Sequence, residues 1–335
     1  MGEPDRHDRQ TKGRDMPRED NPNAAVPGSG RTQSEHEIGS SAAVAPMPPA
    51  TGELAPGVVT ELSQRVRRIV APNPSLMTGP GTGTYLVGDP AGDLAVIDPG
   101  PDDNVHLDRI VEAGGERIRW VLVTHTHMDH SPGVAGLVAR TGATSVGFEP
   151  REGFAPAVLA GDGWTVELGG TTLRALHTPG HASNHLCWLL EEEGLLFSGD
   201  HIMNGSTVVI APLDGDMAAY LDQLERLRAL GLVAIAPGHG KLITDPEAKI
   251  DEYLTHRRAR EAQVASELES LGEGTTVDAL VARMYADVAP ALHPVAKFSV
   301  WAHLRKLAAE GRAVASSPDD VNGTWAPASQ GPTRA

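Results

Sequence analysis

The hexapeptide His-Thr-His-Met-Asp-His that begins at His125 constrains the fold of this chain more than any other segment. It follows the apolar run Trp120–Val123, which we expect to be a buried strand. Because side chains alternate along an extended segment, His125 and His127 leave the same face and can reach one cation. Asp129 and His130 lie just beyond, offset enough to reach a second cation. Imidazole together with carboxylate suits zinc, and also iron or manganese.

Three later turns each carry one further residue that can bind a metal. Each follows a short apolar segment and contains glycine, whose backbone can turn sharply and come close to a cation. The turns are Thr178-Pro-Gly-His181, Ser198-Gly-Asp-His201 and Pro237-Gly-His-Gly240. A surface loop with several histidines is the alternative for the hexapeptide alone. Together, the four segments predict a metal site at the ends of strands.

In this order the segments resemble the metallo-β-lactamase superfamily, whose signature is His-x-His-x-Asp-His followed by single His, Asp and His ligands. The resemblance covers roughly residues 60–245. It implies an α+β fold, the four-layer αββα sandwich, with two divalent metal ions. Carried over position by position, it assigns the first metal to His125, His127 and His181, the second to Asp129, His130 and His239, and the bridging position to Asp200.

The resemblance also implies a binuclear metal-dependent hydrolase. Two cations that share a water lower its pKa from ~15.7 towards ~7, and the resulting bridging hydroxide is the expected nucleophile. Asp129 is the expected catalytic residue, because it would bind metal and also orient the hydroxide. Zn²⁺ is the expected metal, with iron or manganese as alternatives. The scissile bond is expected to be an ester, a thioester or a phosphodiester.

The chain divides into four expected parts. Residues 1–50 and 316–335 are rich in Gly, Pro, Ser and Asp, so we expect both to be disordered. Residues 51–245 form the catalytic domain. Residues 246–315 have the pattern of three helices and a short strand, which is the plan of a winged-helix-like domain. Lys and Arg nearly balance Asp and Glu there, which favours a lid, docking or dimer element over a DNA reader.

This C-terminal pattern resembles a subgroup of the superfamily that includes a mitochondrial lactamase-like endoribonuclease. The resemblance makes single-stranded RNA a candidate substrate. A glyoxalase-II-like thioesterase or lactonase acting on a small metabolite is the alternative. A DNA-binding ligand sensor and a two-iron oxidoreductase are alternatives from other classes.

Charge and hydropathy limit the partners. A formal net charge of −16 disfavours non-specific nucleic-acid binding, so duplex DNA is not expected as a partner. No apolar run approaches the ~18 residues of a membrane-spanning helix, so no membrane is expected and the cytoplasm is the default location. Cys187 is the only cysteine, which excludes an intrachain disulfide. The expected partners are a small-molecule ester or thioester or single-stranded RNA, and a homodimer is left open.

Some polar residues have open roles. His185 either supports the site or packs in the core, whereas His201 is expected to be structural. Gly83 stands where most relatives of the resembled family have Asn, which would remove one polar contact near the site. A basic cluster consists of Arg257, Arg258 and Arg260. It forms either salt bridges along a helix, such as one from Arg257 to Glu261, or a phosphate contact.

Overall fold

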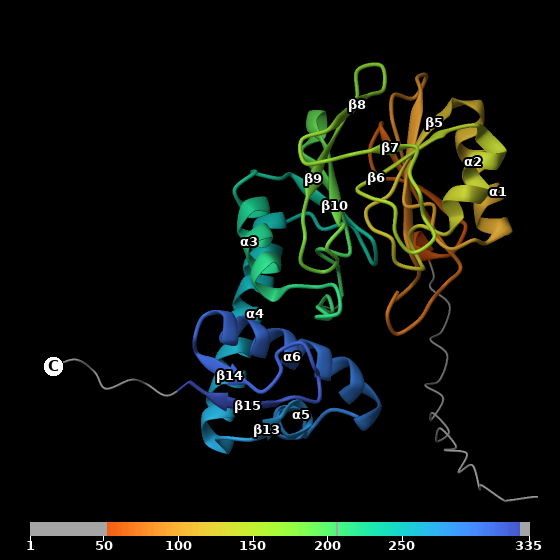
Figure 1. Cartoon of the computed structure of the whole chain (residues 1–335). Coiled ribbons are helices and arrows are strands. Elements are labelled where there is room, and N and C mark those ends of the chain that lie inside the picture. The colour runs from red at the N-terminus through yellow and green to blue at the C-terminus, as the bar shows by residue number, and fades with distance from the viewer. Residues whose placement is uncertain (1–51, 206, 329–335) are drawn as a thin grey trace, which may run out of the picture. The chain divides into compact units, whose positions relative to one another are not determined.

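The computed structural model describes residues 52–205 and 207–328 of the 335-residue chain. Two β-sheets stack face to face and helices cover their outer faces (Figure 1). The expected four-layer αββα sandwich is therefore confirmed. The expected disordered segment 1–50 lies outside the described residues.

The first sheet has seven strands that lie in sequence order. They are β1 (Val59–Glu61), β2 (Val66–Val70), β3 (Gly83–Val87), β4 (Leu94–Ile97), β5 (Ile118–Leu122), β6 (Thr144–Gly147) and β7 (Val158–Leu159). β1 to β4 pair antiparallel, whereas β4 to β7 pair parallel. Parallel neighbours need crossover connections. Two of these are α1 (Asn104–Gly114) and α2 (Gly133–Thr141), which pack on the outer face of the sheet.

The second sheet has the strand order β12-β11-β10-β9-β8. Its strands are β8 (Thr165–Glu167), β9 (Thr172–His177), β10 (Leu186–Leu190), β11 (Leu195–Gly199) and β12 (Ala234–Pro237). Helix α3 (Met217–Arg228) connects β11 to β12 and buries Tyr220 and Leu224 against the sheet. Asp216 caps α3 because its side chain accepts a hydrogen bond from the Ala219 amide.

The hydrophobic core between the two sheets holds them together face to face. Leu122 and Val146 of the first sheet pack in one cluster with Trp188 and Phe197 of the second, and all four are buried. Burying such side chains stabilises the fold by roughly 1.5–3 kcal/mol each. Because the two sheets are stacked in this way, the turns after β5, β9, β11 and β12 meet at one edge.

The C-terminal domain combines three helices with a small sheet. Its elements are α4 (Pro246–Leu271), β13 (Thr275–Thr276), α5 (Val277–Met284), α6 (His293–Ala309), β14 (Ala313–Ala315) and β15 (Thr324–Pro327). Short 3-10 helices lie at Gly52–Leu54, Gly115–Arg117, Glu191–Glu193 and Pro290–Leu292. The expected winged-helix plan is confirmed. Across residues 52–205 and 207–328, no helix has the length and apolarity needed to cross a bilayer.

The expectation that residues 316–335 are disordered is wrong for their first part. Thr324–Pro327 form β15, which is the central strand of the three-stranded sheet β13-β15-β14. Trp325 is only 1% exposed and packs among Val264, Leu280 and Leu304 of the three helices. The segment is polar in composition, but one large anchor and pairing to two strands are enough to order it.

Trp325 provides a test of this domain's core. Replacement of Trp325 by alanine is expected to lower the free energy of unfolding by about 3–5 kcal/mol, because it leaves a cavity in a closed cluster. Urea unfolding followed by tryptophan fluorescence and circular dichroism measures this loss. Val314→Ala on the neighbouring strand β14 is the control, because Val314 is 57% exposed. Equal stability of the two variants would contradict the role of Trp325.

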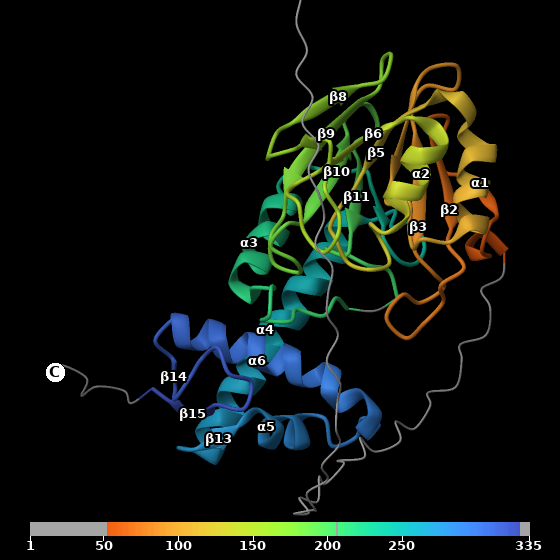
Figure 2. The same cartoon turned by 45° about the vertical axis from the view of Figure 1, so that its right-hand side comes forward.

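Helices α4 and α6 pack against both domains. α4 extends from the side of α3 into the C-terminal domain (Figure 2). Its Tyr253 is buried in the same cluster as the residues of α3, whereas Leu268 is buried in the core of the C-terminal domain. In α6, Val300 packs within the C-terminal domain while Ala302 packs in the same cluster as α3. In three-helix variants of the helix-turn-helix DNA readers, the third helix enters the major groove. Here Ala302 of α6 packs against the catalytic domain instead.

Candidate metal centre

Seven side chains converge where the strand ends of the two sheets meet. They form three overlapping groups, and within each group one ligand-capable atom per residue lies within 4.8 Å of those of the other residues. The turn after β5 supplies His125, His127, Asp129 and His130, and the turns after β9, β11 and β12 supply His181, Asp200 and His239. All the residues that the sequence pattern selected as ligands are therefore neighbours in space.

The first group consists of three imidazoles. His125 Nε2 lies 2.9 Å from His127 Nδ1, and His181 Nε2 lies 3.0 Å from the same atom. Three nitrogens bound to one tetrahedral zinc ion at 2.0–2.1 Å would be about 3.3 Å apart. The three facing nitrogens can therefore accept one cation after a small outward movement.

The second group combines one carboxylate with two imidazoles. Asp129 Oδ2 lies 3.2 Å from His130 Nε2 and 3.2 Å from His239 Nε2. His130 and His239 are buried, while the Asp129 side chain is partly open to solvent. One oxygen and two nitrogens thus face a common point, with an open side through which a substrate can approach.

Asp200 lies between the two groups. Its Oδ1 is 3.4 Å from His130 Nε2 and 3.2 Å from His239 Nε2, which belong to the second group. Its Oδ2 is 3.9 Å from His181 Nε2 in the first group. One oxygen of a single carboxylate therefore faces each group, which is the geometry of a bridging ligand.

The second ring nitrogen of four histidines is held by an outer partner. The pairs are His125 Nδ1 with Thr124 Oγ1 at 3.0 Å, His130 Nδ1 with Asp98 Oδ2 at 2.8 Å, His181 Nδ1 with Val209 O at 2.9 Å and His239 Nδ1 with Gly81 O at 3.4 Å. Such partners fix the tautomer and the direction of the other nitrogen.

Asp98 is a supporting residue that the sequence pattern did not indicate. It is buried in the turn after β4 with a positive φ of 49°, which is uncommon for a residue other than glycine. Its carboxylate accepts hydrogen bonds from the Thr124 amide and hydroxyl at 2.8 and 2.7 Å and contacts His130. The one sequence feature that could have predicted this role is the position of an acidic residue directly after β4, the parallel neighbour of β5.

Removal of the Asp98 charge is expected to weaken the metal centre. Asp98→Asn should lower the affinity for one metal ion about 10–100-fold, which is the usual cost of losing an outer partner of a histidine ligand. Competition with a chromophoric chelator measures the affinity. Asp93→Asn is the matched control, because Asp93 is exposed and pairs only with Arg119 among its described partners. Unchanged affinity in Asp98→Asn would contradict the role of this carboxylate.

The loop before β3 contacts one of the ligands through Thr82, the neighbour of Gly83. Thr82 Oγ1 donates to Asp129 Oδ2 at 3.2 Å. Asn73 in turn fixes Thr82, since its amide group donates to Thr82 Oγ1 at 2.9 Å and its oxygen accepts from the Thr82 amide at 2.9 Å. The Gly83 amide donates to the Gly238 carbonyl at 2.8 Å. The loop is thereby tied to the turn that carries His239.

The electrostatics differ between the two groups. Burial lowers the pKa of His125, His127 and His181, the last to about 4, so these imidazoles are neutral. Burial alone would also lower the pKa of His239, but the charge of Asp200 and hydrogen bonds to both carboxylates raise it to about 9. Burial opposes ionisation of Asp200, yet His239 and His130 hold its pKa well below the ordinary value. The second group therefore holds protons on its imidazoles, and a bound cation would replace these protons.

Metal uptake is accordingly expected to release protons. At about pH 8, below the pKa of about 9 of His239, this imidazole is protonated in the metal-free protein, and the pKa of His130 is also raised by the neighbouring carboxylates. Binding requires neutral imidazoles, so we expect at least about one proton to leave on filling the second group. Calorimetry in buffers of different ionisation enthalpy measures the number. Metal binding without proton release at this pH would contradict the expected protonation.

The other histidines lie outside the metal-type groups found among the described residues. His201 is buried and packs 4.7 Å from the ring of Tyr220, as expected for a structural residue. His185 is also buried; its Nδ1 lies 2.9 Å from Thr178 Oγ1 and its ring lies 5.0 Å from that of His125. His185 therefore packs behind the first group.

The basic cluster on α4 is divided among different contacts. Arg258 donates to Glu225 at 2.6 Å, and Arg260 stacks over Tyr285. The expected pair between Arg257 and Glu261 is wrong: Arg257 donates to the Val208 carbonyl instead. Glu261 is held by salt bridges to Lys306 at 2.8 Å and Arg312 at 2.9 Å. The three arginines do not present one phosphate-binding surface.

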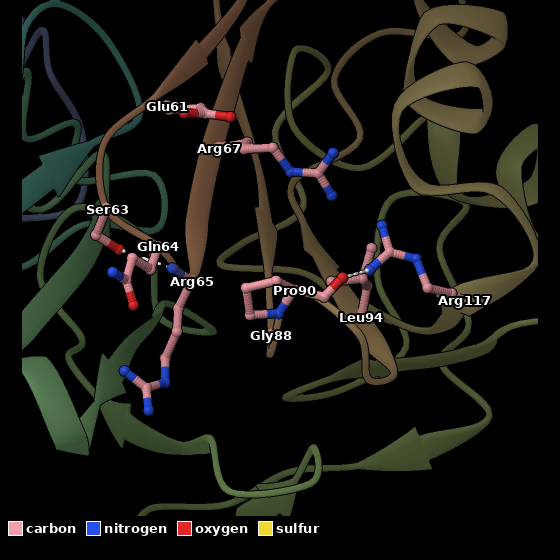
Figure 3. Close-up of a pocket in the computed structure, with 9 residues that line it drawn as sticks. All are labelled: Glu61, Ser63, Gln64, Arg65, Arg67, Gly88, Pro90, Leu94 and Arg117. Atoms are coloured by element: carbon pink, nitrogen blue, oxygen red, sulfur yellow. Dashed lines mark hydrogen bonds between the residues drawn. The ribbon is translucent and has the colours of Figure 1, made fainter.

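A separate basic cavity lies at the far end of the first sheet. It has a volume of about 340 Å³ and is lined by residues from the turn between β1 and β2, from β2, and from the segments at the end of β3 and the starts of β4 and β5, whereas the metal-type ligands follow strand β5. Figure 3 shows Arg67 and Arg117 reaching towards the same space. Arg67 donates to the Ala113 carbonyl and Arg117 to the Pro90 carbonyl. This cavity is not part of the metal centre.

Comparison with known proteins agrees with the fold and the site. Residues 78–239 match the Metallo-beta-lactamase superfamily, and residues 276–325 match the Beta-lactamase associated winged helix domain. The chain therefore belongs to the metallo-beta-lactamase superfamily and is a metal-dependent hydrolase of that superfamily.

Curated relatives extend over both domains. The Beta-lactamase-like protein 2 homolog of Drosophila melanogaster is 33% identical over 292 residues, which cover 81% of this chain and 97% of that protein. The homolog of the same name in Caenorhabditis elegans is 31% identical, covering 76% and 87%. Lactamase-like protein aptB of Emericella nidulans is 34% identical, covering 69% and 77%. The chain is thus similar to these proteins through most of their length.

Solved structures share the fold. A metallo-beta-lactamase family protein from Thermus thermophilus superposes with a TM-score of 0.65 at 23% identity, covering 80% of this chain and 100% of its own. A beta-lactamase domain protein from Burkholderia ambifaria gives a TM-score of 0.70 at 21% identity, covering 85% and 96%. At this level of identity the likeness establishes the architecture and leaves the substrate open.

Proposed function

We propose that this protein is a binuclear metal-dependent hydrolase that cleaves an ester or thioester of a small molecule. The observation that carries the proposal is the position of Asp200, whose two oxygens face two separate ligand groups. A single-metal site would need only one of those groups. A carboxylate between two cations also reduces their mutual repulsion.

The donors present fit two divalent cations. Five imidazoles and two carboxylates suit zinc, with iron or manganese as the alternatives. His125, His127 and His181 would hold the first ion and Asp129, His130 and His239 the second. Two such ions, when bound, polarise the substrate oxygen and lower the pKa of a water from ~15.7 towards ~7.

Asp129 is the proposed catalytic carboxylate. Burial disfavours its charged form, but His130 and hydrogen bonds to His130 and His239 hold its pKa below the ordinary value. Thr82 fixes its Oδ2 through the hydrogen bond described above. An ionised carboxylate held in this way would orient the attacking water towards the substrate carbon while it also serves as a ligand.

The surroundings of the ligands favour an acyl substrate over a polyanion. Met128, between two ligands in sequence, is 73% exposed, and Leu213, beside the Asp214 that accepts from the Ser183 amide, is 78% exposed. The nearby cation Arg151 is already paired with Asp214 at 2.9 Å. An exposed apolar side chain that neighbours ligands in sequence, such as Met128, can bind the chain of an acyl group, whereas RNA binding depends on cations that contact phosphates.

Three substrates given to the same preparation test the proposal. Zinc-reconstituted protein is mixed with acyl-glutathione thioesters, with p-nitrophenyl esters of increasing acyl length and with a fluorogenic single-stranded RNA. We expect ester or thioester turnover that rises with acyl length, stops on chelation and returns with zinc. RNA cleavage without ester or thioester turnover would overturn the substrate assignment, and full activity after exhaustive chelation would overturn the metal mechanism.

A further inference from the structure

We propose that the C-terminal domain positions the metal ligand His181, because Arg257 and Arg305 hold the segment whose carbonyl orients that imidazole. The proposal rests on the proposed metal centre. It gives the winged-helix domain a role in completing the active site of its own chain.

The first step is the contact between His181 and Val209. His181 Nδ1 lies 2.9 Å from the Val209 carbonyl oxygen, so an Nδ1–H can donate to it. That bond leaves the lone pair of Nε2 directed at the site, where Nε2 lies 3.0 Å from His127 Nδ1. Movement of the Val209 carbonyl would therefore turn the imidazole or permit the wrong tautomer.

The second step is that no helix or strand fixes this carbonyl. Residues 207–212 lie in the connection from β11 to α3 and have no regular secondary structure. A carbonyl in such a segment depends on contacts to its neighbours. The side chains of Val208 and Ile210 are buried in the cluster that includes α3 and α4. These apolar contacts hold the segment against α3 and α4 but do not set the direction of its carbonyls.

The third step is that two arginines of the C-terminal domain supply directional contacts. Arg257 of α4 donates to the Val208 carbonyl, and Arg305 of α6 donates to the Pro212 carbonyl at 2.8 Å. Tyr253 of α4 adds a third attachment, because its hydroxyl donates to the Met203 carbonyl and accepts from the Met203 amide, both at 3.1 Å. The connection is thus attached to α4 and α6 before, beside and after Val209.

The environment of Arg257 supports a dedicated role. The residue is 2% exposed, and its guanidinium lies over the Tyr220 ring at 5.5 Å. Burying a charged group is costly unless its donors are used; among the described residues Arg257 donates to the Val208 carbonyl, while its Nε has no hydrogen-bond partner. The planar guanidinium is suited to hold several acceptors in fixed directions, and lysine cannot reproduce this. Its neighbour Arg258 is exposed and pairs with Glu225. The two residues therefore differ in burial and in contact with the segment that carries Val209.

Two arginine variants and one control test the proposal. Arg257→Met and Arg305→Met remove the directional contacts, and Arg258→Gln removes an exposed pair on the same helix. Zinc affinity is measured by chelator competition well below each melting temperature. Histidine ¹⁵N chemical shifts of the metal-free protein report the tautomer of His181. A residue with only a structural role would change the melting temperature and leave both readouts unchanged.

We expect Arg257→Met to lower the affinity for one of the two zinc ions at least about 10-fold, as the loss of an outer partner of a ligand does. We also expect it to give a mixture of His181 tautomers. Arg305→Met should shift both readouts in the same direction, and Arg258→Gln should match the wild type. Folded Arg257→Met with wild-type affinity and a single His181 tautomer would overturn the proposal. If Arg257→Met does not fold, Arg305→Met decides by the same criteria.

The same data separate this proposal from the proposed function. Wild-type protein that binds no zinc would overturn the metal centre. The His181 tautomer in the metal-free variants would then still decide whether α4 and α6 orient the ring. Wild-type protein that binds two zinc ions with unchanged variants would overturn the positioning role alone.

Discussion

Asp200→Asn is expected to lower kcat/KM for the ester or thioester substrate by more than about 100-fold, beyond the usual cost of losing an outer partner. Asparagine keeps the shape of the side chain but removes the negative charge between the two ligand groups. Two cations a few ångströms apart would then repel each other without compensation. We therefore expect elemental analysis to find fewer than two metal ions per chain in this variant.

The neighbouring residue provides the control for Asp200. His201 is buried beside Tyr220 and lies outside the ligand groups, so His201→Phe replaces one flat ring by another. We expect this variant to keep its metal content and most of its activity. If Asp200→Asn retained two ions and full turnover, the bridging role would be wrong.

Gly238→Ala is the second substitution with a large expected effect. A β-carbon at this position would lie 2.7 Å from Asp200 Oδ1 and 2.9 Å from His130 Cε1, closer than real contacts allow. Either the carboxylate or the turn that carries His239 must move. A displacement of about 1 Å in a catalytic site can cost on the order of 100-fold in rate. We expect a loss of that size in kcat/KM, together with weaker metal binding.

Gly161→Ala is the matched control for this substitution. A β-carbon at Gly161 would meet no atom within 4 Å, and its φ is not positive. The control should keep the activity and metal affinity of the wild type. Equal behaviour of Gly238→Ala and Gly161→Ala would show that the close packing around Asp200 is not needed.

The ligand groups could be predicted from sequence because each ligand has a local signal. His125 and His127 alternate after an apolar strand, and the later ligands stand in glycine turns at strand ends. Strand ends on one side of stacked sheets are brought together by the core, whatever the detailed packing. The residue types and the chain order were therefore sufficient to select the side chains that converge.

The supporting residues could not be predicted in the same way. Asp98 contacts His130 across 32 positions, and Thr82 contacts Asp129 across 47. These contacts depend on the register of β4 against β5 and on the path of the loop before β3. The Val209 carbonyl is a backbone group, so no residue type marks it. Such partners are set by tertiary geometry and have no local pattern.

The C-terminal domain shows the same division. The helical pattern after Pro246 predicted α4, but the role of Arg257 did not follow from spacing. A helical i,i+4 interval suggested a pair with Glu261, whereas tertiary contacts direct Arg257 to a loop and Glu261 to α6 and Arg312. Trp325 lies in a polar segment, so composition alone could not show that it closes a core.

The ligands come from both sheets, and this has a consequence for how the protein matures. The stretch up to β6 supplies four of the seven ligand residues, but each three-residue set also needs His181, Asp200 or His239 from the later sheet. During synthesis the earlier half therefore offers an incomplete chelate, and both cations can be captured only after the halves have stacked. Once bound, the ions would be coordinated by both halves and would stabilise their association. Metal loading would therefore be among the last steps of folding.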